Sequence, residues 1–348
     1  MTNVDPRNVN FMIRLFRFGA QSEATSLRRR VVLFGCAALA AAAAVSPAAA
    51  GDWPERPIRV IVPYGAGGTS DTLARLTADR LSKMLKQPMV IENRAGAGGA
   101  IGTEVAARAD ADGYTLFFAS VSQITVSPLT HKLKFDPMKD LTPISLVGEN
   151  PMGIAVHPSF PAKTLKEMID YVRANPGKVN YANAGIGTNS HLVGAAFTKK
   201  LGLKMVAVPY KSANPATTAV IAGEVPVYFG NTTDTIKHAK NGTLRQLAVT
   251  TEKRLPQYPD IPTVAETVPG FSWVSFNAVF APTGTPQPII DRVAKDIAAI
   301  CKDPDFVKRL EPLGVVAHST TPAESIALVK EDAVRSAEAV DAAGVRVK

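Results

Sequence analysis

The sequence predicts an α/β fold with mostly parallel sheets, divided between two domains. Short apolar runs alternate with amphipathic helical patterns, which is the order expected of parallel strands joined by covering helices. The alternation breaks off and begins again after Pro151. The chain has 348 residues, and beyond roughly 250–300 residues a chain usually divides its hydrophobic core between domains.

The first fifty residues predict a secretory leader. Arg28, Arg29 and Arg30 precede an apolar run at 31–45, and a small-residue cleavage site ends at Ala50. A basic segment, a short apolar run and an Ala-x-Ala site together are typical of a signal peptide. The apolar run is shorter than the roughly 20 residues of a membrane helix. We therefore expect export to the periplasm with cleavage near Ala50, and the general and twin-arginine routes both remain open.

Charge, cysteine and histidine content exclude several functions. Without residues 1–50 the chain keeps 33 basic and 28 acidic residues, a net charge of about +5. It has no Lys/Arg-rich block interleaved with aromatics, so no nucleic-acid partner is expected, whereas a small anionic ligand is compatible with this charge. Cys301 is the one cysteine after the leader, so no internal disulfide is possible. The five histidines lack metal-ligand spacing, so no metal site is predicted.

The chain after the leader begins with a βαβαβ pattern. Strands are expected at 58–64, 88–93 and 114–120, with helices at 72–86 and 101–109 between them. Each helix would carry the chain back to start the next parallel strand, so this region would form one open sheet.

The pattern continues through the rest of the chain. Thr164 with Glu167 and Thr321 with Glu324 each match a capping box at a helix start, and Gly202 suits a helix C-cap. The further strands are expected at 152–157, 179–185, 205–210, 225–231, 243–250 and 271–282, and the further helices at 165–175, 191–201, near Asp234, at 286–303 and at 321–340.

Four expected strand-to-helix turns consist largely of Gly, Ser, Thr and Asn. They lie at 65–71, 119–123, 184–191 and 210–215. In open α/β sheets such turns lie at the carboxyl ends of the strands, where ligands bind. Small residues let a ligand approach backbone amides, and a helix N-terminus favours an anion. The turns together predict a site for a ligand with one or two carboxylates; the alternative is ordinary tight turns, with Asp71 capping its helix.

Nucleotide binding and catalysis are the competing functions. Residues 185–190, "GIGTNS", approach a dinucleotide-binding loop, but Ser190 replaces the third glycine and no acid follows before Glu224. No nucleotide or other cofactor is therefore expected. An exported α/β hydrolase would use Ser190 and His191, yet adjacent helical residues project about 100° apart, and no G-x-S-x-G elbow occurs. We expect no enzyme activity and no catalytic residues.

Five stretches carry a family resemblance. They are "WPERPIRVIVPYGAGGTSDTLAR" at 53–75, "VIENRAGAGGAIGTEVAARADADGYTL" at 90–116, "NYANAGIGTNSHL" at 180–192, "VPYKS" at 208–212 and "FAPTGTP" at 280–286. In this order they resemble the Bug-type extracytoplasmic solute receptors of tripartite tricarboxylate transporters. The resemblance implies a two-lobed periplasmic-binding-protein fold of type II, with two open, mostly parallel sheets joined by crossing hinge strands. It also implies a monomer that closes like a Venus flytrap on a small carboxylate and delivers it to permease subunits; a ligand sensor for a signalling partner is the alternative.

The resemblance also implies domain limits and site residues. Lobe 1 would comprise residues 51–152 and 273–348, and lobe 2 residues 153–272. The first-lobe grip would consist of Tyr64, Gly67, Gly68, Thr69, Ser70 and Asp71, with Ser120, Ser122 and Gln123 beside it. The second-lobe grip would consist of Gly187, Thr188, Asn189, Ser190 and His191, with Ser212 and Ala213 next to it. Asn231 and Phe276 would line the side of the cleft that reads the rest of the ligand; core packing for Phe276 and helix capping for His191 are the alternatives.

Several positions depart from the family pattern. Ser212 stands where glycine is common, Phe276 where Trp is usual, and the acids expected at Pro226 and near Gly230 are missing. Losing an acid near the site would ease binding of an anion or of a flat, less polar body. The ligand is therefore expected to be a di- or monocarboxylate, with aromatic acids included, and titrating dicarboxylates against aromatic acids tests this hypothesis.

Overall fold

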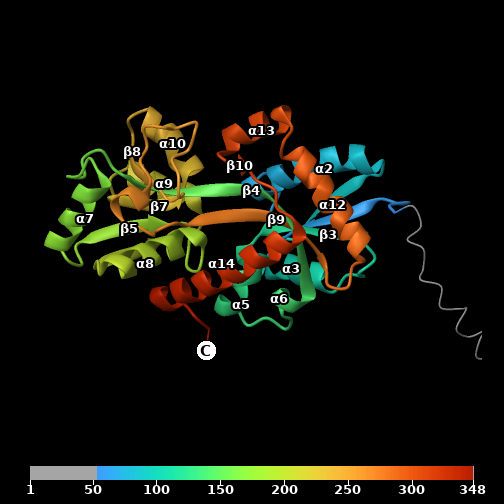
Figure 1. The fold of residues 1–348 in the computed structure, drawn as a ribbon. Coiled ribbons are helices and arrows are strands. Elements are labelled where there is room, and N and C mark those ends of the chain that lie inside the picture. Colours follow the sequence, from blue (N-terminus) through green and yellow to red (C-terminus); the bar gives the residue numbers. More distant parts are fainter. Residues whose placement is uncertain (1–52, 348) are drawn as a thin grey trace, which may run out of the picture. The chain divides into compact units, whose positions relative to one another are not determined.

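Ten strands form the sheet in the computed structural model, which describes residues 53–347 (Figure 1). The predicted leader lies outside the described residues. The strands are β1 (Ile58–Val62), β2 (Met89–Asn93), β3 (Thr115–Ser120), β4 (Leu141–Val156), β5 (Val179–Asn183), β6 (Met205–Pro209), β7 (Val227–Asn231), β8 (Arg245–Val249), β9 (Val274–Pro282) and β10 (Val316–Ala317). Their order is β2-β1-β3-β9-β4-β7-β5-β6, and β8 and β10 pair with β4.

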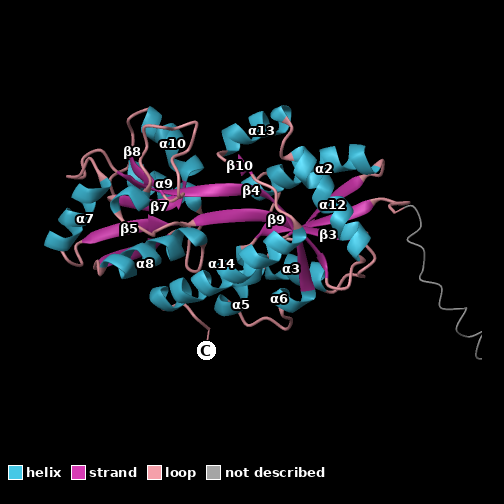
Figure 2. Cartoon of the chain, viewed as in Figure 1, coloured by secondary structure: helices cyan, strands magenta, loops and turns pink. Residues whose placement is uncertain are grey.

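Helices of very different length connect these strands (Figure 2). The longer ones are α2 (Thr69–Leu85), α3 (Ala100–Ala107), α7 (Leu165–Ala174), α8 (Asn189–Leu201), α9 (Ala213–Ile221), α10 (Thr232–Lys240), α12 (Gln287–Ile300), α13 (Pro304–Leu310) and α14 (Pro322–Ala343). The short ones are η1 (Ala97–Gly99), α4 (Ser122–Thr125), α5 (Ser127–Thr130), α6 (Pro137–Asp140), α11 (Val264–Thr267) and η2 (Glu311–Leu313). No helix within residues 53–347 is both long and apolar enough to cross a bilayer.

The sheet is parallel towards its two ends and antiparallel in its middle. β1 pairs in parallel with β2 and β3, and β5 pairs in parallel with β6 and β7. Between these groups the long strands β4 and β9 run antiparallel to each other, as they do side by side in Figure 1. The expected α/β fold with parallel strand groups joined by crossing strands is confirmed, and the crossing strands make the complete sheet mixed.

β4 is longer than the sequence indicates. It begins at Leu141, whereas the predicted strand began at 152. Pro143 and Pro151 lie within it, and proline usually marks a break in a central strand. The strand tolerates Pro143 because its pairing with β9 shifts register between Pro143 and Ser145. As a result, one strand pairs with β9 as far as Pro151 and with β7 from Met152 onward.

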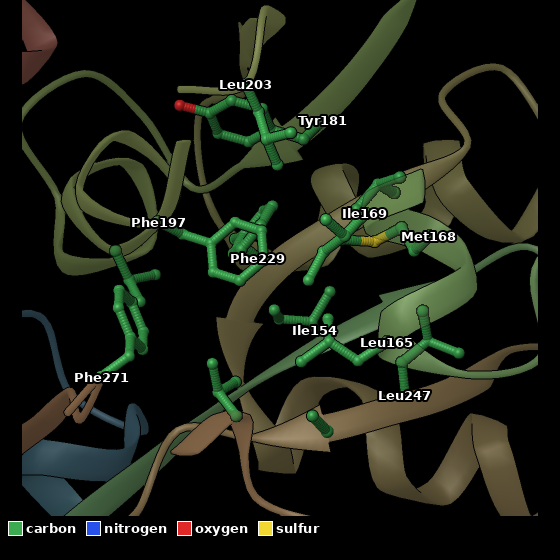
Figure 3. Close-up of a cluster of buried hydrophobic side chains, with 14 of the residues drawn as sticks. Ile154, Leu165, Met168, Ile169, Tyr181, Phe197, Leu203, Phe229, Leu247 and Phe271 are labelled. Carbon is green, nitrogen blue, oxygen red and sulfur yellow. The ribbon is translucent and has the colours of Figure 1, made fainter. Parts of the chain in front are cut away.

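The larger core cluster lies around β5 and β7. The Phe229 ring packs against Tyr181 and Phe197, with ring centroids 5.1 and 5.5 Å apart (Figure 3). Ala339 and Val340, near the end of α14, belong to the same buried cluster. The C-terminal helix therefore contacts the core of the region predicted as lobe 2, although its sequence falls in the segment assigned to lobe 1; the lobe limits themselves remain a prediction.

Helix ends follow local chemistry. Thr321 and Glu324 form the expected capping box at the start of α14, and Gly202 ends α8 with a φ of 61°. At α7 the Thr164 hydroxyl accepts the Glu167 backbone N–H as predicted, but the Glu167 carboxylate accepts the N–H of Lys163.

Candidate ligand-binding cleft

A cleft of about 590 Å³ lies beside the central strands. Its lining residues come from β4 and β9, from the segments that follow β1, β2, β3, β5 and β7, and from the end of η2. First-turn residues of α2, α8, α9 and α10 contribute to the lining. Since a helix N-terminus carries unpaired N–H groups and a partial positive charge, this arrangement favours an anion in the cleft.

The geometry of the turn between β1 and α2 accounts for its glycines and small polar residues. Gly67 has a φ of +86°, which favours glycine, and its N–H donates to the Asp71 carboxylate at 2.8 Å. Asp71 is buried and also accepts from Arg75 at 3.0 Å and from Asn93 at 2.8 Å. Burial alone would raise the pKa of Asp71, but these hydrogen bonds outweigh it and hold the pKa below its usual range. Asp71 thus holds the turn from within, and no side chain caps the N-terminus of α2.

Tyr64 and Gln123 form a fixed corner of the cleft. The Gln123 amide donates to the Tyr64 hydroxyl at 3.1 Å and to the Gly98 carbonyl at 3.0 Å. Burial raises the pKa of Tyr64 to about 12, so its hydroxyl keeps its proton. A Cβ on Gly99 would lie 2.5 Å from Oε1 of Gln123. The glycine cluster at 96–102 is therefore needed partly for close packing against Gln123.

Side chains of β9 connect the first turns of two helices. Ser70 of α2 donates to Oδ1 of Asn277 at 2.9 Å, and Nδ2 of Asn189 in α8 donates to the Ser275 hydroxyl at 2.9 Å. All four side chains line the cleft. The first turns of α2 and α8 are therefore both hydrogen-bonded to β9.

Ser190 and His191 do not form a nucleophile and base pair. The Ser190 hydroxyl accepts the Ala184 N–H at 2.8 Å and lies 2.9 Å from the Thr188 hydroxyl. Nδ1 of His191 accepts the Gly187 N–H at 3.2 Å. Burial also lowers the pKa of His191, which favours the neutral ring. Each side chain thus holds the turn before α8, and the geometry gives no support to a hydrolase.

Most of the predicted site residues line the cleft. They are Tyr64, Thr69, Ser70, Ser120, Ser122, Gln123, Gly187, Thr188, Asn189, Ser190, Ala213 and Asn231. Gly67, Gly68, Asp71, His191, Ser212 and Phe276 do not belong to the lining. For Gly67, Gly68, Asp71, His191 and Ser212, direct contact with a ligand stays a prediction.

Phe276 lies on the wrong face of its strand for the predicted role. Side chains alternate along a strand, so Ser275 and Asn277 point to the cleft while Phe276 points away. Phe276 packs against the core cluster that contains Phe117 and Phe280. The core-packing alternative describes this residue.

Sequence reasoning missed several lining residues. Ser275 and Asn277 could have been found, because they are polar residues at a spacing of two in an otherwise apolar strand. His131 and Asp234 also line the cleft. The sequence did not mark them, because His131 belongs to no motif and Asp234 is one of many acids expected in helices. Positions 226 and 230 lack an acid, but Asp234 lines the cleft, so the cleft keeps one acidic side chain.

The lining contains few ionisable groups. Among the described lining residues there is no Lys or Arg, and His131 and Asp234 are the only charged or imidazole side chains. In residues 53–347 no group of three or more His, Cys, Asp or Glu side chains is placed to hold a metal ion. Recognition in this cleft would therefore rely on neutral hydrogen-bond donors.

Comparisons with known proteins identify the family of the chain. A family model described as the tripartite tricarboxylate transporter family receptor matches residues 73–345. A UPF0065 protein of Bordetella bronchiseptica is 36% identical over 88% of this chain and 91% of its own. Protein BugT of Bordetella pertussis is 33% identical over 89% of this chain and 96% of its own.

Solved structures with similar sequences have the same fold. The periplasmic binding protein BugD is 36% identical and matches 85% of this chain and 100% of its own with a TM-score of 0.70. Rpa4515 of R. palustris with adipate is 32% identical, over 84% and 99%, with a TM-score of 0.74. MatC of Rhodopseudomonas palustris with bound malate is 31% identical, over 83% and 100%, with a TM-score of 0.70. With the family model covering most of its length and these binding proteins sharing its fold, the chain belongs to the tripartite tricarboxylate transporter receptor family of periplasmic solute-binding proteins.

Proposed function

We propose that this protein binds a small organic carboxylate in the cleft and delivers it to the permease of a tripartite tricarboxylate transporter. The observation that carries the proposal is the convergence of the α2 and α8 N-termini on a cleft whose described lining has no Lys or Arg. The related structures with adipate and malate support a carboxylate as the ligand class.

Neutral groups of the two helix starts supply the donors. Thr69 and Ser70 open α2 without a side-chain cap, so their backbone N–H groups are available to a ligand oxygen. At the start of α8, Asn189 provides its backbone N–H and the side-chain amide N–H that it does not donate to Ser275. Each helix N-terminus stabilises a bound anion by about 0.3–1 kcal/mol. Each hydrogen bond to a charged group adds about 1.5–3 kcal/mol to the binding free energy. A few such contacts suffice for binding without an ion pair.

Closure would occur about the two central strands. β4 crosses from the region predicted as lobe 1 into the region predicted as lobe 2, and β9 begins where the chain returns to lobe 1. A ligand that contacts both α2 and α8 binds the closed arrangement better than an open one, and this difference in affinity drives closure. The permease would then recognise the closed form; a signalling partner could use the same change.

Calorimetric titration of the purified protein tests the proposal. Mono-, di- and tricarboxylates are each compared with the corresponding neutral amide, and only the acids should bind. Ser70→Ala removes the hydroxyl that hydrogen-bonds the first turn of α2 to Asn277 of β9 and should weaken binding of the best acid, while Ser82→Ala, on the same helix outside the cleft lining, should not. Loss of this hydrogen bond between neutral groups, about 0.5–1.5 kcal/mol, corresponds to roughly a two- to tenfold weakening. Absence of binding by every acid, or equal binding of acids and amides, would contradict the proposal.

A further inference from the structure

Tyr228 and Asp234 form a hydrogen-bonded pair in the wall of the cleft. The Tyr228 hydroxyl donates to Oδ2 of Asp234 at 2.8 Å, and both residues line the cleft. Tyr228 and Gly230 lie on the same face of β7 because side chains alternate along a strand. A Cβ on Gly230 would collide with the hydroxyl and ring of Tyr228. Glycine at 230 therefore makes the space in which the tyrosine reaches Asp234.

The pair leaves part of the Asp234 carboxylate available. Asp234 lies in the first turn of α10, which follows the N-cap Asn231. Burial raises the pKa of Asp234, while hydrogen bonds from Tyr228 and from the Asn231 backbone oppose that rise. Burial also keeps the pKa of Tyr228 well above 10, so its hydroxyl remains a donor. A carboxylate has about four acceptor positions, and these two partners occupy only some of them.

This carboxylate gives the cleft two chemically different regions. Asp234 is the sole acidic side chain in the described lining, whereas the first turns of α2 and α8 offer hydrogen-bond donors. A second ligand carboxylate placed beside Asp234 would meet a like charge, which is unfavourable in a partly buried site. A protonated amine there would instead donate to the open acceptor positions and gain a charge-assisted hydrogen bond.

We propose that the ligand is a carboxylate that also carries a protonated amine, and that Asp234, held by Tyr228, binds the amine and disfavours dicarboxylates. This inference rests on the proposed carboxylate-receptor function and names its ligand class. If Asp234 only capped α10, that role would explain the hydrogen bond from the Asn231 backbone to its carboxylate. It does not account for a buried tyrosine hydroxyl that holds the same carboxylate in the cleft wall.

Matched ligand pairs test the inference by calorimetry at pH 7.5. The pairs are 3-aminopropanoate with malonate, 4-aminobutanoate with succinate and 5-aminopentanoate with glutarate. The wild-type protein should bind at least one amino acid tenfold or more tightly than its dicarboxylate partner. Asp234→Asn should weaken the binding of that amino acid tenfold or more, while the affinity for the dicarboxylate should stay the same or improve. Asp170→Asn, in an exposed ion pair on α7, is the matched control and should change neither.

The outcomes separate the two proposals. Equal or tighter binding of the dicarboxylates by the wild-type protein would overturn this inference and leave the receptor function intact. Equal weakening of both classes by Asp234→Asn would overturn it too, because that pattern indicates a structural role. Tyr228→Phe keeps the ring but removes the hydroxyl, so it provides a second test and should weaken only the amino acid. If no acid of either class binds, the carboxylate-receptor function fails as well.

Discussion

Replacing Gly102 with alanine tests how closely α3 must approach the cleft. A Cβ at Gly102 would lie 2.7 Å from the Arg94 carbonyl oxygen and 2.7 Å from Cα of Pro63. Both atoms belong to the backbone, so relief requires movement of α3 or of the chain at Pro63. Because Tyr64 follows Pro63 and lines the cleft, that movement would also disturb the ligand site.

The expected magnitude follows from two opposing terms. Alanine is favoured over glycine in a helix by about 1 kcal/mol, whereas overpacking a tight site costs about 1–3 kcal/mol. Gly102→Ala should therefore lower the free energy of unfolding by up to about 2 kcal/mol and weaken ligand binding. Chemical denaturation measures the first effect and calorimetry the second. Gly65→Ala, whose Cβ would meet nothing within 4 Å, is the control for stability alone. A Gly102→Ala protein more stable than the wild type would refute the packing argument.

Three further substitutions test the core, the central strand and the cleft. Phe229→Ala empties a fully buried site and should cost about 3–5 kcal/mol in chemical denaturation; a loss below about 1 kcal/mol would contradict the core assignment. The hydrogen bond from His318 to Glu149 raises the pKa of His318, so its stabilising effect is full below the ordinary value of about 6.5 and is lost as the pH rises through the raised pKa. As the pH falls from 8 to 6, the melting temperature of the wild type should therefore rise more than that of Glu149→Gln. Equal changes in the two melting temperatures would disprove this. Asn189→Ala removes the donor to Ser275 and should raise Kd about two- to tenfold with little change in unfolding; an unchanged Kd would argue against this support.

The fold was predictable because its signals are local. Residues 58–62 and 115–120 are apolar runs that ended as buried strands, and Thr321 with Glu324 marked the start of α14 correctly. The start of β4 was missed because Pro143 resembles a strand break, and only its pairing with β9 shows how the strand continues.

The cleft was predictable from its turns but less so from its strands. Ser70 and Asn189 follow apolar runs in small-residue turns, and both line the cleft. Phe276 was chosen from the family resemblance, although the polar residues Ser275 and Asn277, at a spacing of two, marked the other face of β9. The place of Asp234 in the cleft wall depends on its hydrogen bond with Tyr228, and only the structure shows where Tyr228 lies.

A crystal structure with the carboxylate that binds best in calorimetry tests the central claim most directly. We expect a ligand carboxylate in the cleft, with its oxygens about 2.7–3.2 Å from donors in the first turns of α2 and α8. Thr69, Ser70 and Asn189 are the residues expected to supply those donors. A carboxylate bound outside the cleft, or held there by a Lys or Arg drawn in from elsewhere, would contradict recognition by neutral groups.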